Sequence, residues 1–460
     1  MKRSLFLLSL LCLISSCGKS FSDIKGSFEK ETLTQIVKKI DRDIVSMSTA
    51  EVEIVSSLYS RKSLTKSSEK TIKEIIPIKD SNGKILMYAV NYDDGYIIVS
   101  ATKKYYPILA DVERGTFSIE DMADEPKFLI EELLGKINIA ETSENFPDLS
   151  KYWTPYIEPA RIDIEKTKAN SDYYDLFESY LEDWYADGCS VYYLYKKPEN
   201  MPEDMYNEFY RIAEDDMAEV NGYPFRECAV ITEQTFETSN KKGPLLKTTW
   251  DQESGYNSQV PGQKVLGCVT VAVGQIMKYH EYPKNYDWAN MANSTPTSTS
   301  ASFLAKLRTE LKVSDKGGTT DKHAKRVLKD YGYSCSDVLK HDNTKVTASL
   351  SKNNPVYMGG QKKSDPSIGH AWVCDGYMYT IPSRTYTLYL LTFENGKPSA
   401  LESWYEETIY DSYPFFFHMN WGWCGSYNGY FLDSDIDLAK YGKNCNYSVD
   451  RTDIIISGHN

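Results

Sequence analysis

The sequence predicts an α+β protein of more than one domain, and three observations lead to that prediction. At 460 residues, the chain is longer than one hydrophobic core usually serves. Its 41% hydrophobic and 25% charged residues are typical of globular proteins. From Leu245 onward, helical patterns come first and strand patterns follow, which is the order expected of an α+β domain.

The first 17 residues predict a lipoprotein signal peptide. Residues 1–3 are basic at two positions, and residues 5–13 are apolar but too few to span a bilayer. The sequence ISSC, ending at Cys17, is similar to a bacterial lipobox, in which the cysteine is lipidated. We therefore expect an exported protein anchored by lipid in the cell envelope, at the outer membrane or cell surface, from which processing could release it. An ordinary cleavable signal is the alternative.

Residues 18–140 change from polar to strand-like and then helical character. Residues 18–75 are polar and predict a tether, with weak helical periodicity at 33–47. Residues 85–90 and 95–100 are β-rich runs around a short turn sequence, which predicts a hairpin. Residues 120–137 carry apolar side chains at helical spacing and predict a helix.

Acidic charge is concentrated in the middle of the chain. Residues 141–240 carry 23 acidic and 8 basic side chains, whereas residues 241–460 carry 22 acidic and 24 basic ones. The net charge of −13 argues against nucleic acid as a partner. The many aromatic residues over 150–235 predict a small folded core. Residues 233–244 are polar and turn-rich, which predicts an exposed linker open to proteolysis.

Cys268 opens an apolar run and is the strongest candidate for chemistry. It follows Gly267, and the run ends before Pro283, which cannot continue a helix. This pattern predicts a helix that begins at Cys268 and ends near His280. The N-terminus of a helix favours an anion, so the thiol there is biased toward the nucleophilic thiolate. The alternative is a cysteine that only packs in a core.

The rest of this segment predicts further helices and strands. Helical patterns cover residues 302–311 and 320–331. Strand-like runs, with a hairpin turn at 394–397, follow at residues 355–358, 369–376 and 415–418. No Cys/His spacing typical of zinc sites is present, so we expect no metal and no other cofactor.

Two of the six histidines could act as the base for this thiol. His280 lies on the same helix, about 18 Å away at 1.5 Å per residue, and is too far. His370 begins a strand directly after Gly369 and is favoured, while His418 stays open as the alternative. The remaining histidines are expected at the surface: His323, His341 and His459.

The turn after His418 could orient that base. The side chain of Asn420 can accept a hydrogen bond from an imidazole N–H and fix its tautomer. The indole of Trp421 could shield the pair from water. The alternative is that the tryptophans and glycine mark only a packed hairpin.

Four segments together resemble the streptopain family of cysteine peptidases. GCVTVAVGQIMKYHEYP at 267–283 resembles its nucleophile helix, and GHAWVCDG at 369–376 resembles its histidine strand. HMNWGW at 418–423 resembles its tryptophan turn, and WDQESGYN at 250–257 resembles the segment with its oxyanion-hole glutamine. The hairpin region over 84–115 is similar to the family's inhibitory propeptide.

The resemblance implies a papain-like, two-lobed peptidase domain, with a helical lobe and an antiparallel β lobe, preceded by an α+β inhibitory pro-region. Cys268 would be the nucleophile and His370 the general base and then acid. Gln252 would stabilise the oxyanion together with the backbone N–H of Cys268. Trp421 would pack on His370, with Asn420 as an orienting neighbour. The substrate cleft would be lined by Gly369, Gly318 and Trp423.

These expectations divide the chain into five parts. They are a signal peptide and lipobox (1–17), a tether (18–75), a propeptide core (76–140), an acidic Tyr-rich extension with an activation linker (141–240) and a catalytic domain (241–460). We expect a lipid-anchored zymogen that cuts proteins and peptides, is inhibited by its own pro-region and removes that region itself. Cys374 and Cys424 depart from the family's pattern and could form disulfides. The alternatives are a catalytically silent surface-binding protein on this fold and a Cys–His amidase acting on cell-wall peptides.

Overall fold

In the computed structural model, the chain divides into residues 1–39 and residues 40–460. The described residues are 39–41, 45–63, 70–120, 122, 124–158, 160, 171–217, 229–362, 365–395, 397–410, 413–433 and 449–459. The predicted signal peptide, the lipobox and Cys17 lie outside these residues. Within them, no helix is both long enough and apolar enough to cross a bilayer.

The N-terminal part of the described chain is an antiparallel sheet that carries two helices. Strands β1 to β4 pair in chain order, and β2 with β3 confirms the predicted hairpin. The helix predicted over 120–137 is confirmed as α3, with later bounds. The helical prediction for 33–47 is wrong in its described part, because Ile40 and Ser46 form isolated bridges there. The elements are α2 (Thr49–Ser63), β1 (Ile72–Lys79), β2 (Ile85–Tyr92), β3 (Tyr96–Ser100), β4 (Ile108–Val112) and α3 (Asp124–Thr142).

The acidic middle of the chain is folded, as predicted from its aromatic residues. Its elements are η2 (Ser150–Tyr156), α4 (Ser171–Ala186), β5 (Ser190–Tyr193), α5 (Glu203–Met217) and β6 (Ala229–Lys242). The linker predicted over 233–244 is wrong, because all 14 residues of β6 pair with strand β10 (Asp365–Glu394). The side chains of residues 236–241 are exposed, which explains why this strand has the polar composition of a linker.

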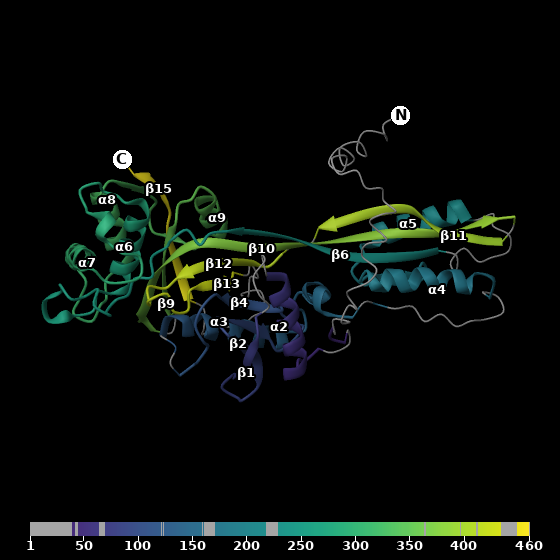
Figure 1. The fold of residues 1–460 in the computed structure, drawn as a ribbon, viewed down its shortest axis with the longest axis horizontal. Coiled ribbons are helices and arrows are strands. Elements are labelled where there is room, and N and C mark those ends of the chain that lie inside the picture. The colour runs from purple at the N-terminus through teal and green to yellow at the C-terminus, as the bar shows by residue number, and fades with distance from the viewer. Residues whose placement is uncertain are drawn as a thin grey trace, which may run out of the picture. The chain divides into compact units, whose positions relative to one another are not determined.

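Three helices group together in the C-terminal half (Figure 1). Helix α6 (Cys268–His280) has the predicted bounds, and α7 (Ser298–Glu310) and α8 (Asp321–Asp330) lie close to theirs. The hydroxyls of Thr297 and Thr320 accept hydrogen bonds from the first turns of α7 and α8, which fixes where these helices begin. The shorter helices are η3 (Pro261–Gln263), η4 (Trp288–Asn290) and α9 (Asn343–Ser351).

The strands of the C-terminal half extend the N-terminal sheet. The sheet has the order β1-β2-β3-β4-β13-β12-β10-β9-β14-β8, and β6 and β11 also pair with β10. The two halves join where Gly429 of β13 pairs with Val112 of β4. The further strands are β7 (Tyr333–Cys335), β8 (Leu339–Lys340), β9 (Val356–Lys362), β11 (Lys397–Tyr410), β12 (Phe415–Asn420), β13 (Gly429–Leu432), β14 (Val449–Ile454) and β15 (Ile456–His459). Helices and an antiparallel sheet together confirm the predicted α+β class.

Strand β10 contributes to three separate apolar cores. Trp372 packs in a first core with the N-terminal sheet, and Val373 packs in a second core with α6, α7 and α8. Leu388 packs in a third core with α4, α5, β5 and β6. This one strand of 30 residues therefore ties the site region to the N-terminal sheet and to the acidic middle.

Candidate active site

Cys268 is the first residue of α6, where the helix N-terminus favours an anionic sulfur. Gly267 precedes it with a φ of 83°, and its carbonyl accepts a hydrogen bond from the N–H of Thr270 at 3.0 Å. A Cβ added at Gly267 would lie 2.3 Å from the carbonyl oxygen of Gly317. Glycine is therefore required here both by conformation and by space. The Cys268 thiol is half-buried and free.

The loop that contains Gly318 packs against the turn before Cys268. Arg308 of α7 donates from Nε to the carbonyl of Val265 at 2.8 Å and from Nη2 to the carbonyl of Ser314 at 2.7 Å. The N–H of Gly318 donates to the hydroxyl of Ser314 at 3.1 Å. These bonds hold the exposed Gly318 close to the loop that ends at Cys268.

His370 lies on β10, opposite Gly360 of β9, and its side chain is 5% exposed. Its Nε2 is 3.1 Å from the carbonyl oxygen of Trp421. Because a carbonyl only accepts hydrogen bonds, this contact assigns the proton of the neutral ring to Nε2. Nδ1 is then the basic nitrogen of the imidazole.

Three tryptophans surround the imidazole of His370. The ring centroids of Trp372, Trp421 and Trp423 each lie 6.1 Å from that of His370, with interplanar angles of 16°, 26° and 20°. Trp421 is 1% exposed and packs on His370 in the way that the resemblance implies. Exclusion of water by these rings strengthens the electrostatic interactions of the imidazole.

Helix α6 and strands β9 and β10 share the core that lies under the site. Val269 of α6 and Ala371 of β10 pack in one cluster, and Cys268 packs against it. Tyr357 of β9 is fully buried in the same cluster. Burial raises the pKa of its phenol well above the ordinary value, and the charge of Asp321 raises it further. Cys268 and the strand that carries His370 are thus packed on the same side chains.

The backbone of Gln252 is held beside the loop that ends at Cys268. Its carbonyl accepts a hydrogen bond from the N–H of Leu266 at 2.9 Å, two residues before Cys268. The neighbouring Asp251 forms an isolated antiparallel bridge with Trp423. The backbone of this segment therefore connects the loop that ends at Cys268 with the tryptophan turn.

Asn420 holds the tryptophan turn in place. Its Oδ1 accepts a hydrogen bond from Nε2 of Gln275 at 3.1 Å, and its Nδ2 donates to the carbonyl of Thr248 at 2.8 Å. The oxygen within hydrogen-bond distance of His370 belongs to the next residue, Trp421. The expected hydrogen bond from the imidazole to the Asn420 side chain is therefore wrong, and Asn420 holds the backbone of the turn instead.

Gln275 is a site residue that the sequence did not single out. It is fully buried on α6, and its Oε1 accepts a hydrogen bond from the N–H of Trp250 at 3.2 Å. Its Nε2 donates to Asn420. One side chain therefore links the nucleophile helix to the Gln252 segment and to the tryptophan turn. The available signal was a polar residue within an apolar helix, since buried polar groups need partners.

His418, the alternative base, belongs to a buried pair. Its Nδ1 lies 2.6 Å from Oδ1 of Asp375, and the two residues are 3% and 0% exposed. The other oxygen of Asp375 accepts a hydrogen bond from the N–H of Leu246 at 2.9 Å. The ring of Tyr430 covers the imidazole of His418 at 4.9 Å. This arrangement favours His370 as the base.

Three other residues differ from expectation or answer an open question. His341, expected at the surface, is largely buried and lies 3.3 Å from Asp433 and 3.1 Å from Asp453. The burial of the His341 ring could not be predicted from sequence, because both of its partners are more than 90 residues away. Cys374 and Cys424 are free thiols, the first buried and the second exposed.

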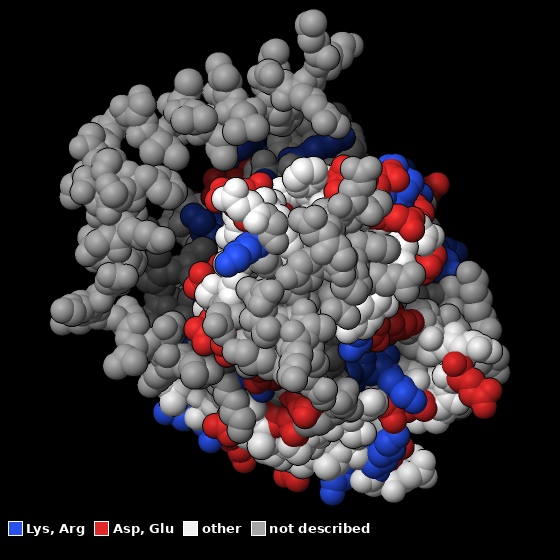
Figure 2. Space-filling view, turned by 90° about the vertical axis from the view of Figure 1, so that its right-hand side faces the viewer, with Lys and Arg blue, Asp and Glu red and all other residues white. Residues whose placement is uncertain are grey.

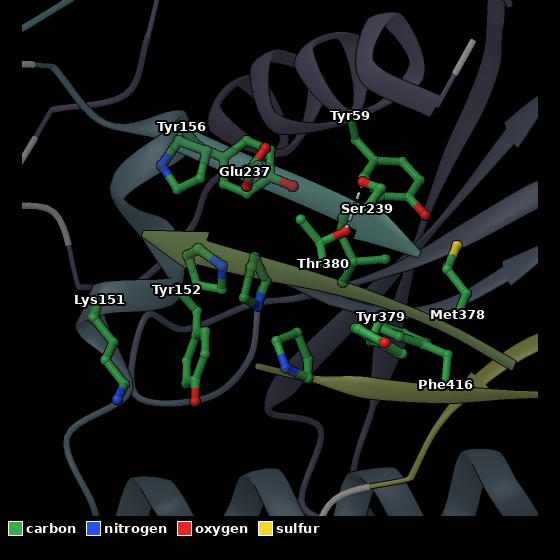
Figure 3. Close-up of a pocket in the computed structure, with 15 residues that line it drawn as sticks. Tyr59, Lys151, Tyr152, Tyr156, Glu237, Ser239, Met378, Tyr379, Thr380 and Phe416 are labelled. Atoms are coloured by element: carbon green, nitrogen blue, oxygen red, sulfur yellow. Dashed lines mark hydrogen bonds between the residues drawn. The ribbon is translucent and has the colours of Figure 1, made fainter. Parts of the chain in front are cut away.

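A hollow of about 120 Å³ lies between the N-terminal part of the chain and strands β6 and β10 (Figure 3). Tyr59 and Tyr156 line it from one side and Tyr379 from β10. Ser239 and Thr380, on the paired strands, have hydroxyls 3.1 Å apart. None of the predicted site residues lines this hollow, so it is distinct from the candidate active site.

Two protein families match separate parts of the chain. Residues 250–286 and 284–431 match the Peptidase C10 family, and residues 45–137 match the Spi protease inhibitor family. The first match spans Gln252, Cys268 and His370. Residues 250–431 are therefore similar to the Peptidase C10 family. The peptidase domain is thus preceded by a domain of the kind named for protease inhibition.

The peptidase domain has relatives among characterised proteins. Thiol protease/hemagglutinin PrtT of Porphyromonas gingivalis is 25% identical over 292 residues, which are 50% of this chain and 29% of that protein. Streptopain of Streptococcus pyogenes is 24% identical over 226 residues, which are 38% of this chain and 48% of streptopain. The chain therefore spans less than half the length of these two relatives. A prointerpain A fragment of Prevotella intermedia matches in structure with a TM-score of 0.40 at 16% identity, covering 83% of this chain and 97% of the fragment.

Proposed function

We propose that the chain is a cysteine endopeptidase made as a zymogen. The observation that carries the proposal is the setting of His370, whose Nε2 faces the carbonyl of Trp421 inside a ring of tryptophans, on a strand packed against the helix that Cys268 begins. A single neutral tautomer with a basic Nδ1 suits a group that takes a proton from a thiol. The matches to a peptidase family and to a protease-inhibitor family support the same function.

The proposed reaction proceeds through a thioester. His370 takes the proton of Cys268, and the thiolate attacks the carbonyl carbon of a peptide bond. The N–H of Cys268 and the side chain of Gln252 stabilise the oxyanion that forms. The C–N bond breaks as His370 gives its proton to the leaving amine. Water then gives a proton to His370 and attacks the thioester, which releases the new carboxyl group and restores the thiol.

The substrate would lie across exposed glycines near the two reacting residues. Gly318 is exposed on the loop beside the nucleophile turn, and Gly369 is exposed next to His370. Glycines leave the peptide backbone of a substrate room to approach closely. Trp423, half-buried, offers an indole face at the same edge.

Residues 45–137 would act as the inhibitor of this domain. Their strand β4 pairs with β13, nine residues after the end of β12, and their core includes Trp372 and Trp421 of the site. Glu113 and Arg114 line a hollow of about 670 Å³ together with Asn420 and Cys424. The pro-region is thus packed on the tryptophan turn that holds His370.

Self-processing would occur within 233–244, and the pairing of this segment adds a requirement. Residues up to Lys242 are hydrogen-bonded to β10, and a peptide must leave its sheet partner to enter a protease cleft. We therefore expect the cut at the end of this segment, after Lys242, so that β6 stays paired with β10. Anchoring of the exported protein through a lipid on Cys17 is also proposed, on the sequence pattern of the first 17 residues.

Replacement of the nucleophile tests the proposed activity. The purified precursor with Cys268→Ser should not shorten on incubation and should not hydrolyse casein, because a hydroxyl is a far weaker nucleophile than a thiolate. Cys335→Ser, which alters a thiol on β7, should retain both activities. Electrophoresis, N-terminal sequencing and casein hydrolysis give the measurements. If the Cys268→Ser chain still shortened without an added protease, the autocatalytic proposal would be wrong.

The alternative functions predict different results. A silent binding protein would leave Cys268 unreactive toward iodoacetamide, whereas a nucleophile should be alkylated faster than Cys335. A cell-wall amidase would release peptides from murein and leave casein intact.

A further inference from the structure

The third core is built jointly by the acidic middle of the chain and by a hairpin of the peptidase domain. Its buried residues from the acidic middle include Phe177, Val191 and Phe209. Leu388 and Leu401 come from β10 and β11, the hairpin over 383–410. Figure 1 shows α4 and α5 alongside β6, β10 and β11. Neither partner has this core alone.

Aromatic contacts and a backbone ladder join the two partners. The ring of Trp184 on α4 lies 4.7 Å from Tyr389, and that of Phe209 on α5 lies 5.1 Å from Tyr405. Strand β6 pairs with β10 from Ala229 to Lys242 without a shift in register. Such ring pairs add about 0.5–1.5 kcal/mol each beyond the area that they bury.

Buried polar groups cross the same boundary. Glu233 of β6 is 4% exposed and accepts hydrogen bonds from Tyr192 at 3.0 Å and from Tyr386 at 3.3 Å. Arg384 of β10, 3% exposed, lies 4.0 Å from Glu233. If the partners separated, the Glu233 carboxylate and the Arg384 guanidinium would either stay buried without each other or become exposed together with apolar surface. Both outcomes are unfavourable.

Each partner needs the other to stay folded. A two-stranded hairpin is marginally stable by itself, and without β6 the hairpin would expose Tyr386, Leu388 and Leu390, which are now at most 2% exposed. Without β10, the 14-residue strand β6 would keep only its short pairing with β5.

We propose that residues 171–242 are a permanent subunit of the peptidase and remain bound to the 383–410 hairpin after the inhibitor domain is cut away. The inference rests on the proposed function only in taking a cut precursor as the mature form. The peptidase would then work as a complex of two polypeptides. Residues 45–137 would be the only part of the described pro-region whose departure activation requires.

Apolar packing, rather than opposite charge, holds this subunit. The described surface at this end of the molecule mixes acidic and basic side chains without a large area of one sign (Figure 2). Its contacts with the hairpin come from the buried residues of the third core. The complex should therefore survive high salt.

The test uses the full chain with Cys268→Ser and an added protease, so that its outcome does not depend on peptidase activity. A recognition sequence for a site-specific protease is inserted after Lys166 and another between Lys242 and Gly243. The uncut chain should elute from size exclusion as the parent does. After both cuts, the fragment from 167 to 242 should co-elute with the fragment from 243 to 460, also in 1 M NaCl. Separate elution, with the larger fragment still folded by circular dichroism, would overturn the proposal.

Matched variants show which contacts hold the fragment. Trp184→Ala, which removes a ring packed on Tyr389, should speed dissociation of the cut complex on the order of 100-fold. Tyr195→Ala, at a residue that is 56% exposed, should change it less than about twofold. If the two variants changed the dissociation rate equally, the shared core would not be what holds the fragment. A failure of self-processing in the wild-type chain would instead bear on the proposed function alone.

Discussion

Gly267 allows the loop that ends at Cys268 to lie close to the loop that contains Gly317. Gly267→Ala should lower the free energy of unfolding by roughly 2–4 kcal/mol, because it adds a steric clash to an unfavourable backbone conformation. It should also lower kcat/KM by displacing Cys268. Urea unfolding and casein hydrolysis measure the two effects.

Gly83 provides the matched control for this prediction. Its φ of 80° is close to that of Gly267, but a Cβ added there would meet nothing within 4 Å. Gly83→Ala should therefore cost only the conformational part, about 1 kcal/mol. Equal losses in the two variants would show that the contact with Gly317 is unimportant.

Gln275 acts as a positioning residue, since its amide bonds to two segments that carry site residues. Gln275→Leu should leave the N–H of Trp250 and Oδ1 of Asn420 without this partner, at a cost of roughly 2–4 kcal/mol in stability. It should lower kcat more than it raises KM, because the geometry of the reacting groups is affected rather than the contact with substrate.

The control for Gln275 is Gln263→Leu, on the exposed turn that precedes the nucleophile loop. It should change neither kcat nor stability by a measurable amount. If Gln275→Leu behaves like this control, the buried amide does not position the site.

At residue scale, the sequence narrows the candidates most where chemistry demands a rare residue type. Six histidines and nine cysteines leave few combinations, so Cys268 and His370 could be chosen from spacing and neighbours. Gln275 could not, because its partners lie 25 and 145 residues away and nothing local distinguishes its amide from others. The contact from Trp421 to His370 likewise uses a backbone carbonyl, which every residue has.

Helix α3 brings a buried ion pair from the pro-region to a charged cluster of the C-terminal half. Glu132 and Lys136 on α3 are 2.7 Å apart. Burial would raise the pKa of Glu132, but Lys136 and Arg451 of β14 hold it below its usual range. Arg451 pairs in turn with Asp433, which also contacts His341. This element therefore couples the stability of the precursor to pH.

Asp433 and His341 set opposite limits on that stability. Burial would raise the pKa of Asp433, but Arg451 and His341 hold it well below the ordinary 3.8, so its contribution is lost as pH falls through the lowered pKa. Burial and Arg451 would lower the pKa of His341, but its bonds to Asp433 and Asp453 raise it above 6.5. Its contribution is complete below pH 6.5 and is lost as pH rises through the raised pKa.

We therefore expect the contribution of this cluster to the stability of the Cys268→Ser precursor to be largest between about pH 4 and pH 6.5. Urea unfolding followed by tryptophan fluorescence across pH 4–9 measures the profile. His341→Asn should flatten its alkaline side, whereas His323→Asn, at a ring bonded to the nearby Thr319, should not. An unchanged alkaline slope in His341→Asn would contradict the role of this pair.

Elements are predictable where their pattern is local. Helix α6 has its predicted bounds because Gly267 and Pro283 mark its ends and an apolar run fills it. Strand β6 was mistaken for a linker because its pairing with β10 joins residues more than 130 positions apart. Its exposed half carries polar side chains, as exposed strands do, and no local signal reports the partner.

At the scale of the whole molecule, the sheet does not respect the division into pro-region and peptidase. Strands β1 to β4 continue through β13 into the strands of the peptidase, and β6 of the acidic middle lies against β10. Family matches and composition divide the chain into segments, but the backbone hydrogen bonds of β4 with β13 and of β6 with β10 join these segments into one sheet. This continuity could not be predicted from sequence, because it depends on pairings between distant strands.

The pairing of β4 with β13 has a consequence for the protein after residues 45–137 have left. Departure of residues 45–137 would turn Gly429–Leu432 into an open sheet edge and bare the apolar side chains of Phe416 and Phe431 that now face the N-terminal sheet. Open edges recruit strands from other chains. While the N-terminal domain is in place it covers this edge, and the four-residue length of β13 limits how much a strand of another chain could gain by pairing there.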